Sequence, residues 1–225
     1  MRLVLTSDSI TNDVIANKII EFVGKPANEI KFAIINEAYA YEFGSHKWIL
    51  RNLDTIRKYF GDYNIEFVNL LALDTNKIKE RIELADVIFC CGGNTEWLQT
   101  VFEKTGFDKL LSKLLKTKVF VGTSAGSMIV GKLPRLETLN EIYGITDLLG
   151  VKDYLAWFNF SILPHTSKKF PNSRFESCVN ESKKQNYPVY SLSDSSALVI
   201  EDDKHYLIGE DCYKLVNGKI VEKID

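Results

Sequence analysis

Short, wholly apolar segments alternate with amphipathic segments from the start of the chain to residue 121. The apolar segments have the length of β-strands, and the segments between them repeat apolar residues at the spacing of one helix face. A strand that is apolar at every position has both faces buried, which is typical of a parallel sheet covered by helices. The pattern predicts an α/β fold with a mostly parallel central sheet. The expected strands are residues 2–6, 32–35, 65–70, 87–90 and 119–121, and the expected helices are residues 48–60, 76–85 and 107–115, with another that has Thr11 as its N-cap and ends at Gly24.

This regular alternation ends after residue 131. A further apolar strand is expected at residues 158–163 and a polar helix at residues 173–184. Residues 197–200, 206–208 and 213–221 then have the pattern of short antiparallel strands, with Asn217 and Gly218 in a hairpin turn. The chain has 225 residues, of which 45% are hydrophobic, and contains neither a repeat nor a linker-like stretch. We therefore expect a single domain over residues 1–225.

Charge and hydropathy argue against nucleic acids and membranes as partners. The 28 Lys and Arg residues nearly balance the 30 Asp and Glu residues, so the chain has no strong basic field for phosphate groups. The apolar run at the N-terminus is shorter than that of a signal peptide, and no later run approaches the length of a membrane span. Four cysteines without zinc-ligand spacing are typical of reduced thiols in the cytosol. These features predict a cytoplasmic protein.

Residues 122–126, Gly-Thr-Ser-Ala-Gly, have the sequence and the position of a nucleophile elbow. They follow the apolar strand 119–121 and precede the apolar run 128–130, the strand-turn-helix order that such an elbow requires. A sharp turn there exposes the hydroxyl of Ser124, and the flanking glycines keep side chains away from the neighbouring backbone. An ordinary glycine-rich turn is the alternative interpretation, and the buried strand before it makes that alternative weaker. We therefore predict Ser124 as a nucleophile.

A second glycine-rich loop, at residues 91–95, follows the expected strand 87–90. Gly92 and Gly93 leave backbone N–H groups uncovered. With the N–H of Ala125 they could form an oxyanion hole, in which one donor contributes roughly 3 to 4 kcal/mol. Asn94 or Thr95 could also cap a helix that begins here, and the two roles do not exclude one another. The loop lacks Walker or Rossmann spacing and the sequence shows no cluster of metal ligands, so neither a metal nor an organic cofactor is expected.

The chain contains three histidines, so the candidates for a general base are few. His46 and His205 lie among polar residues, as exposed surface histidines do. His165 differs because it follows Pro164 at the end of an apolar strand, where side chains reach the catalytic edge of a sheet. A lone histidine in that position is more often structural, but the elbow elsewhere in the chain favours the catalytic interpretation.

A serine and histidine pair needs an acidic group that orients the imidazole and stabilises its charged form. Asp194 lies between the apolar residues 188–192 and the expected strand 197–200, which suits this role. An Asx turn between those strands is an equally good interpretation of Asp194. Glu137, Glu141 and Asp147 lie between the elbow and the histidine in the sequence and stay open as alternatives.

These motifs together resemble the dipeptidase E family of serine peptidases, to which cyanophycinases are related. The resemblance rests on residues 92–95 (Gly-Gly-Asn-Thr), the elbow around Ser124, Pro164 with His165, and residues 192–198, in matching order and spacing over almost the whole chain. It implies a class I glutamine amidotransferase-like fold, a flavodoxin-like three-layer sandwich, with serine where amidotransferases carry cysteine. Glutaminase chemistry is therefore not expected. The resemblance implies Ser124 as nucleophile, His165 as base and Asp194 as the acid, where the family usually has glutamate.

Members of the dipeptidase E family cleave dipeptides that begin with aspartate, so the resemblance implies a small peptide as substrate. A site for the aspartate carboxylate needs a cation or several N–H donors. Lys168 and Arg174 follow His165 closely enough to be candidates, and Asn94 and Thr95 are further candidates for substrate binding. A solvated basic stretch is the alternative interpretation of Lys168 and Arg174. The residues directly after His165 depart from the usual pattern of the family.

Two other functions compete with a peptidase. The first is an esterase of the α/β-hydrolase type that pairs Ser124 with His205, because the histidine comes last in the chain of such enzymes. The second is a binding module that keeps the fold around a silent site.

Overall fold

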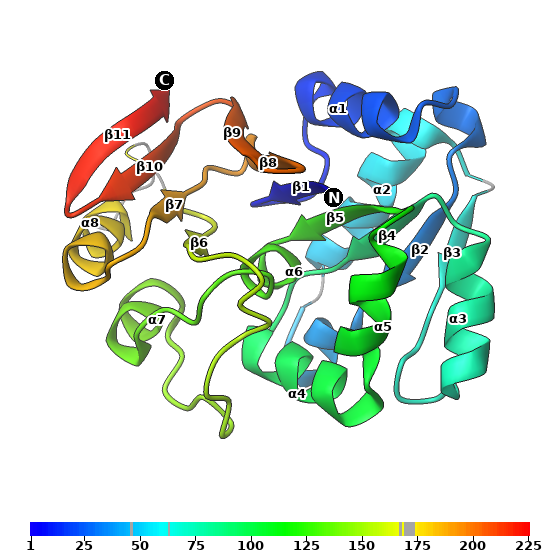
Figure 1. The fold of residues 1–225 in the computed structure, drawn as a ribbon, viewed down its shortest axis with the longest axis horizontal. Helices are drawn as coiled ribbons and strands as arrows, with labels where there is room; N and C mark the ends of the chain where they lie inside the picture. Colours follow the sequence, from blue (N-terminus) through cyan, green and yellow to red (C-terminus); the bar gives the residue numbers. More distant parts are fainter. Residues whose placement is uncertain (46, 63, 167, 169–173) are drawn as a thin grey trace.

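The structure is a computed structural model that describes residues 1–45, 47–62, 64–166, 168 and 174–225. Seven strands form its central sheet in the order β3-β2-β4-β5-β1-β8-β9 (Figure 1). The first five of them run parallel to one another. At one edge, β8 is antiparallel to β1, and β9 is antiparallel to β8. The predicted mostly parallel sheet is therefore confirmed. The strands are β1 (Arg2–Thr6), β2 (Phe32–Ile35), β3 (Ile65–Phe67), β4 (Val87–Cys90), β5 (Val119–Thr123), β8 (Ser196–Glu201) and β9 (Lys204–Gly209).

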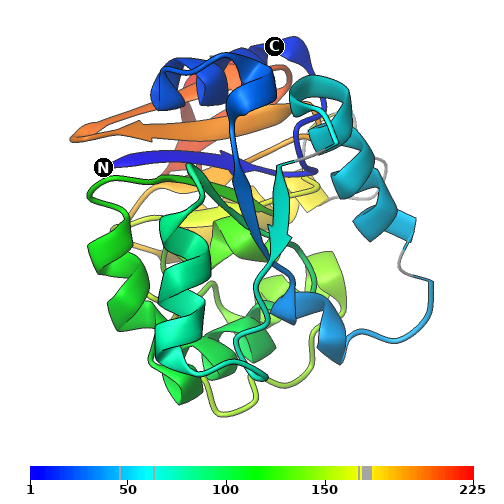
Figure 2. The same cartoon turned by 90° about the vertical axis from the view of Figure 1, so that its right-hand side faces the viewer.

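Helices cover both faces of this sheet, so the molecule has three layers (Figure 2). α1 (Asp13–Val23) and α2 (Lys47–Phe60) pack on the face to which Val4 contributes. α3 (Thr75–Glu83), α4 (Thr95–Thr105) and α5 (Phe107–Leu114) pack on the opposite face, to which Leu3 and Leu5 contribute. Successive residues of one strand thus enter different cores, which explains why the strands are apolar at every position.

A second, four-stranded sheet has the order β11-β10-β7-β6 and lies beside the first (Figure 1). β6 and β7 are parallel, whereas β7, β10 and β11 are antiparallel. The C-terminal antiparallel strands were expected as one group, but β8 and β9 join the first sheet while β10 and β11 join the second. The bounds are β6 (Ser161–Leu163), β7 (Val189–Ser191), β10 (Cys212–Val216), β11 (Lys219–Ile224), α6 (Ala125–Met128), α7 (Leu136–Tyr143), α8 (Arg174–Lys184) and the 3-10 helices η1 (Ala27–Glu29) and η2 (Glu37–Tyr41).

Several element boundaries differ from the expectation. The N-cap of α1 is Asn12, whose side chain accepts a hydrogen bond from the Ile15 N–H at 3.1 Å. Thr11, the expected cap, instead donates its hydroxyl to the backbone oxygen of Asp194 at 2.8 Å. β3 ends at Phe67 and β6 begins at residue 161, so both strands are shorter than expected. These ends were uncertain because apolar residues continue past the point where strand pairing stops.

The carboxyl ends of the parallel strands β4, β5 and β1 lie side by side in the first sheet. The loops that follow these strands carry the glycine-rich segments singled out in the sequence. Ligands of open parallel sheets bind at this edge, which makes it the place of the candidate site. In the part of the chain that the structure describes, no helix is long and apolar enough to cross a membrane.

Candidate active site

Ser124 occupies the sharp turn between β5 and α6, as predicted for an elbow. Its backbone has φ 50° and ψ −113°, a conformation that costs a non-glycine residue roughly 1 to 3 kcal/mol. Hydrogen bonds hold this turn, because the Ser124 N–H donates to the Thr6 oxygen at 3.1 Å and the Ser124 carbonyl accepts from the Ser127 N–H at 2.8 Å. The strained turn presents the hydroxyl at the edge of the sheet.

The glycine at the end of the elbow is required by close packing. A Cβ added to Gly126 would lie 2.1 Å from the carbonyl oxygen of Cys90, which is closer than any side chain can approach. Gly126 therefore lets α6 pack directly against the end of β4. This contact places the elbow next to the loop that follows β4.

The loop after β4 lies beside the nucleophile. A Cβ added to Gly92 would lie 3.0 Å from the Cβ of Ser124. Gly93 has φ +130° and packs against the backbone of Ala38, where a Cβ would come within 2.4 Å of the carbonyl carbon. The oxyanion hole formed by Gly92, Gly93 and the N–H of Ala125 stays a prediction. Its glycines lie in the loop after β4 and Ala125 begins α6, and these two segments meet at Ser124.

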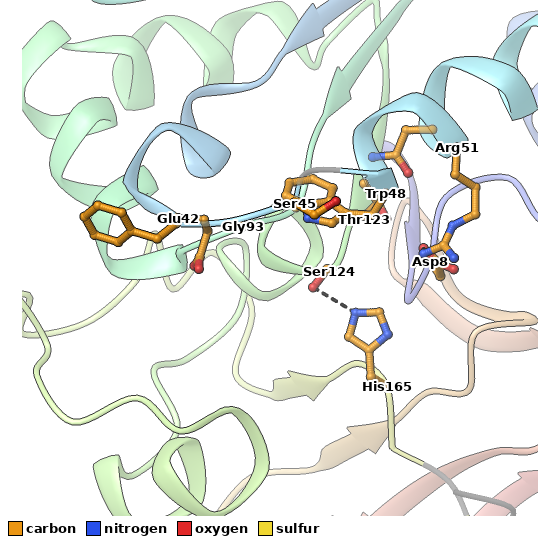
Figure 3. Close-up of a pocket in the computed structure, with 12 residues that line it drawn as sticks. Asp8, Glu42, Ser45, Trp48, Arg51, Gly93, Thr123, Ser124 and His165 are labelled. Atoms are coloured by element: carbon orange, nitrogen blue, oxygen red, sulfur yellow. Dashed lines mark hydrogen bonds and ion pairs between the residues drawn. The ribbon is translucent and has the colours of Figure 1, made fainter.

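His165 reaches Ser124 from the second sheet, and Asp194 contacts His165 from the segment that joins the two sheets. His165 follows β6, and its Nε2 lies 3.1 Å from the Ser124 Oγ (Figure 3). Its Nδ1 lies 2.6 Å from the Oδ1 of Asp194, which belongs to the segment between β7 and β8. A carboxylate at Nδ1 keeps the proton on that nitrogen and leaves Nε2 as the acceptor for the serine proton. The three side chains are arranged as a nucleophile, a general base and an acid.

The other candidate acids are occupied elsewhere. Glu137 forms ion pairs with Arg135 and Lys184. Glu141 accepts a hydrogen bond from the hydroxyl of Ser177 at 2.7 Å, and Asp147 accepts one from the Leu149 N–H at 2.9 Å. Asp194 is the carboxylate that the structure brings to His165.

The electrostatics of Asp194 suit this position. Burial by itself would raise the pKa of its carboxyl group, but hydrogen bonds from His165 and Ser7 and the nearby charges of His165 and Arg51 outweigh burial and lower it. Asp194 is therefore ionised at neutral pH and can stabilise a protonated His165.

A cavity of about 300 Å³ opens over Ser124 and His165 (Figure 3). Arg51, on α2, is the only Lys or Arg among the described residues that line it. Its Nη2 lies 2.8 Å from the Oδ1 of Asp8, which follows β1. Burial, and to a lesser extent the charge of Asp194, raises the pKa of Asp8, although Arg51 opposes this shift.

Ser7, Asp8 and Arg51 were not predicted from the sequence as site residues. Ser7 and Asp8 directly follow a buried strand, so their position at the carboxyl end of β1 was a signal that could have identified them. For Arg51 the sequence offered no signal, because it is one of several cations on an amphipathic helix.

The four predicted substrate-binding residues do not line this cavity. The Lys168 amine lies over the rings of Phe175 and Tyr213, 5.5 and 5.0 Å from their centroids. Arg174 donates to the backbone oxygen of His165 at 3.2 Å, so it contacts the base rather than the cavity.

Asn94 and Thr95 lie at the start of α4. Asn94 caps the helix by accepting from the Trp97 N–H at 2.7 Å, and it also lines a neighbouring cavity with Glu42 and Phe43. The Thr95 hydroxyl faces the sulfur of Met128 at 3.6 Å and is buried. The capping interpretation of Asn94 is therefore correct. The contacts of these four residues are with the protein itself, which sequence spacing could not reveal.

His205 lies on β9 with its ring 5.5 and 5.6 Å from those of Phe158 and Phe160. β9 is three strands away from β5, a separation of about 14 Å at the usual strand spacing. The alternative in which His205 pairs with Ser124 is therefore wrong, because the histidine at Ser124 comes from the second sheet. His46 lies outside the described residues. Among the residues that the structure does describe, no three His, Cys, Asp or Glu side chains are grouped to hold a metal.

Comparisons with known proteins identify the family and the fold of the chain. The family model for peptidase family S51 matches residues 3–208. The chain belongs to this family. A peptidase of Listeria monocytogenes is 28% identical over 129 residues, covering 56% of this chain and 62% of that protein. A peptidase of Pasteurella multocida is 20% identical over 148 residues, covering 64% of this chain and 70% of that protein. The match thus spans about three-fifths of the length of the Listeria relative.

Two solved structures show the same fold. The first is a protein of Listeria monocytogenes EGD-e described as a peptidase E, with a TM-score of 0.70 and 22% identity, covering 92% of this chain and 98% of that one. The second is a peptidase from an acI-B1 actinobacterium, with a TM-score of 0.63 and 15% identity, covering 98% of this chain and 96% of that one. At these identities the likeness establishes the fold of this S51 family member.

Proposed function

We propose that this member of peptidase family S51 is a serine peptidase that cleaves short peptides with an acidic N-terminal residue. The observation that carries the proposal is the hydrogen-bonded series of Ser124, His165 and Asp194 beside a cavity. Arg51 is the only Lys or Arg among the described residues that line this cavity. The cavity volume of about 300 Å³ is at the lower end of the range for ligand pockets, which favours dipeptides over long chains.

The geometry supports acyl transfer through a covalent intermediate. Ser124 Oγ attacks the peptide carbonyl while His165 Nε2 takes the serine proton. The protonated His165 is stabilised by ionised Asp194 and then gives the proton to the leaving amine. N–H groups of Gly93 and Ala125 hold the oxyanion, and water, activated by the same histidine, releases the acyl group.

Arg51 replaces Lys168 and Arg174 as the candidate for carboxylate binding. Its guanidinium has five N–H donors, and the bond to Asp8 leaves others for a carboxylate in the cavity. Half of the Arg51 side chain is exposed, so these donors are accessible from the cavity side. A planar guanidinium binds a carboxylate in two parallel hydrogen bonds, which distinguishes an acidic side chain from a neutral one.

We also propose that the protein works in the cytoplasm. All four cysteines are free and buried, as is usual for proteins of a reducing compartment. Fractionation of cells that produce the protein, with antibody detection, would test this location.

The test of the function is a panel of dipeptides and p-nitroanilides that begin with Asp, Glu, Asn, Ala or Leu. We expect turnover of the Asp and Glu substrates by the wild type and none by Ser124→Ala. Arg51→Gln is expected to raise KM for the acidic substrates about 10- to 100-fold, because a charge-assisted hydrogen bond contributes roughly 1.5 to 3 kcal/mol. It should leave the neutral substrates unchanged.

Arg57→Gln is the matched control, since Arg57 lies on the same helix but pairs with Asp62 at the surface. An equal loss of activity toward acidic and neutral substrates in Arg51→Gln would refute the role of Arg51 in binding the acidic residue. A fluorophosphonate probe that labels Ser124 without any peptide turnover would point to another acyl substrate. Failure of the probe to label folded wild-type protein would favour the silent binding module.

A further inference from the structure

Ser7 contacts both the base and the acid of the site through one hydroxyl group. Its Oγ accepts a hydrogen bond from the backbone N–H of His165 at 2.8 Å. The same hydroxyl donates to the Oδ1 of Asp194 at 2.9 Å and lies 3.4 Å from the Nδ1 of His165. Ser7 is fully buried, so water does not compete for these bonds.

The sheet places Ser7 between the nucleophile and the acid. β1 pairs with β5 on one side and with β8 on the other, so that Thr6 lies opposite both Thr123 and Ala197. Ser7 follows Thr6 directly and therefore emerges beside Ser124 on one side and beside the segment of Asp194 on the other. A residue held by a central strand has a more fixed position than one in a loop.

The backbone oxygen of His165 accepts a hydrogen bond from Arg174 at 3.2 Å, whereas its N–H is held by Ser7, directly after β1 of the first sheet. His165 follows the short strand β6 and has φ +57°, in the left-handed region that residues with a side chain rarely adopt. The Ser7 hydroxyl accepts a hydrogen bond from the His165 N–H, and the Asp194 carboxylate bonds to the His165 Nδ1. One hydroxyl directly after β1 thus holds the N–H of His165 directly and its imidazole through Asp194.

We propose that Ser7 is a positioning residue for the reaction. It holds the backbone of His165 and one oxygen of Asp194 so that Nε2 stays within hydrogen-bond reach of Ser124. The oxygen that accepts from Ser7 is the same Oδ1 that binds Nδ1, so Ser7 also selects the orientation of the carboxylate. In this way a serine directly after β1 of the first sheet fixes the position of a base that the second sheet carries.

The first experiment measures the rate at which a fluorophosphonate acylates Ser124 in the wild type, Ser7→Ala and Ser9→Ala. We expect Ser7→Ala to slow labelling about 10- to 100-fold, because a misplacement of the base by about 1 Å has an effect of that size. With a cleaved peptide, the loss should fall on kcat while KM changes less than about twofold. Ser9→Ala is the matched control: Ser9 is also buried after β1, but its hydroxyl bonds to Thr55, and labelling should stay within about threefold of the wild type.

A double-mutant cycle separates positioning from a general structural effect. If Ser7 acts in part through Asp194, Ser7→Ala should slow labelling by a smaller factor in the Asp194→Ala background than in the wild type. The loss that remains there is that of the bond to the His165 N–H. The same fold loss in both backgrounds would overturn the proposal, as would wild-type labelling by folded Ser7→Ala. Should Ser7→Ala fail to fold, Ser7→Cys replaces the hydroxyl by a somewhat larger thiol that is a weaker donor and a weaker acceptor, and it is expected to label at an intermediate rate. Wild-type labelling by Ser7→Cys would overturn the proposal.

The probe needs no peptide, so these results do not depend on the substrate proposed above. If the wild type labels but cleaves no peptide, the proposed substrate fails and the role of Ser7 is still tested. If folded wild type does not label, the serine peptidase itself fails and this inference fails with it.

Discussion

The two halves of the candidate active site are built in different ways. The nucleophile half comes from one continuous segment, in which β5, Ser124 and α6 follow each other within residues 119–128. The base half joins three segments, because Ser7 meets His165 across 158 positions and Asp194 across 187. The turn of the nucleophile is therefore formed within one local segment, which contacts with Thr6 and Cys90 then hold in place. The base depends on how the two sheets meet.

This difference has a physical consequence. A turn between a buried strand and a helix is stiff because steric contacts such as that of Gly126 with Cys90 leave little room. Hydrogen bonds between distant segments hold the base half, and each of them contributes only about 1 kcal/mol net. We expect the first half to tolerate few changes, and the second half to lose activity in smaller steps.

The largest effects should come from the reacting groups, and they should differ between the two halves. Ser124→Ala removes the nucleophile, so kcat should fall by about 10⁵-fold or more and fluorophosphonate labelling should disappear. Asp194→Asn keeps the shape but loses the charge that stabilises protonated His165, so kcat should fall by about 10³-fold while labelling persists slowly. Steady-state kinetics and intact mass after labelling measure both. Equal losses in the two variants would show that the halves act as one unit.

A smaller effect, on stability, tests the stiffness of the nucleophile half. Gly126→Ala should lower the free energy of unfolding by about 3 kcal/mol, because the new methyl group meets the Cys90 carbonyl. Gly106→Ala is the control: Gly106 has φ +69° and no atom within 4 Å of an added Cβ, so only backbone strain of about 1 kcal/mol applies. Urea denaturation of both variants compares them. A Gly126→Ala protein as stable as Gly106→Ala would mean that the elbow can relax.

The smallest effect concerns two neighbouring carboxylates of the site with opposite pKa shifts. The pKa of Asp194 is lowered, so its ionised form stabilises the folded state above about pH 4, the ordinary pKa of an aspartate, and this contribution is lost as the pH falls further. The pKa of Asp8 is raised by burial, so its contribution is complete below about pH 4 and is lost as the pH rises through the raised value.

Free energies of unfolding between pH 3 and 7 should show this contrast. The advantage of the wild type over Asp194→Asn should shrink toward low pH, and that over Asp8→Asn should shrink toward high pH. Because the Asp194 side chain is 41% exposed, its contribution should be below about 1 kcal/mol. Slopes of the same sign would contradict the assigned pKa directions.

The same contrast explains how much the sequence could predict. The elbow was predictable because strand, turn and helix are encoded by adjacent residues, and the buried strand before Ser124 excluded most other turns. His165 and Asp194 were predictable as strand-end residues. The role of Asp194 stayed open, because an Asx turn explained its position equally well and three other acidic residues were candidates for the same role. Ser7 and Arg51 were missed, because a serine after a strand and an arginine on a helix have no local pattern that separates them from others.

By itself the sequence determined the layered α/β architecture, the parallel strands and the elbow, since each depends on the local order of apolar and small residues. Only the tertiary structure decided which acid reaches His165, which cation lines the cavity and where the C-terminal strands join. These depend on the register between β1, β5 and β8 and on the meeting of two sheets. Contacts of this kind join residues far apart in the sequence, from 29 positions for His165 and Asp194 to 187 for Ser7 and Asp194. Nothing in the local sequence of either partner specifies the other.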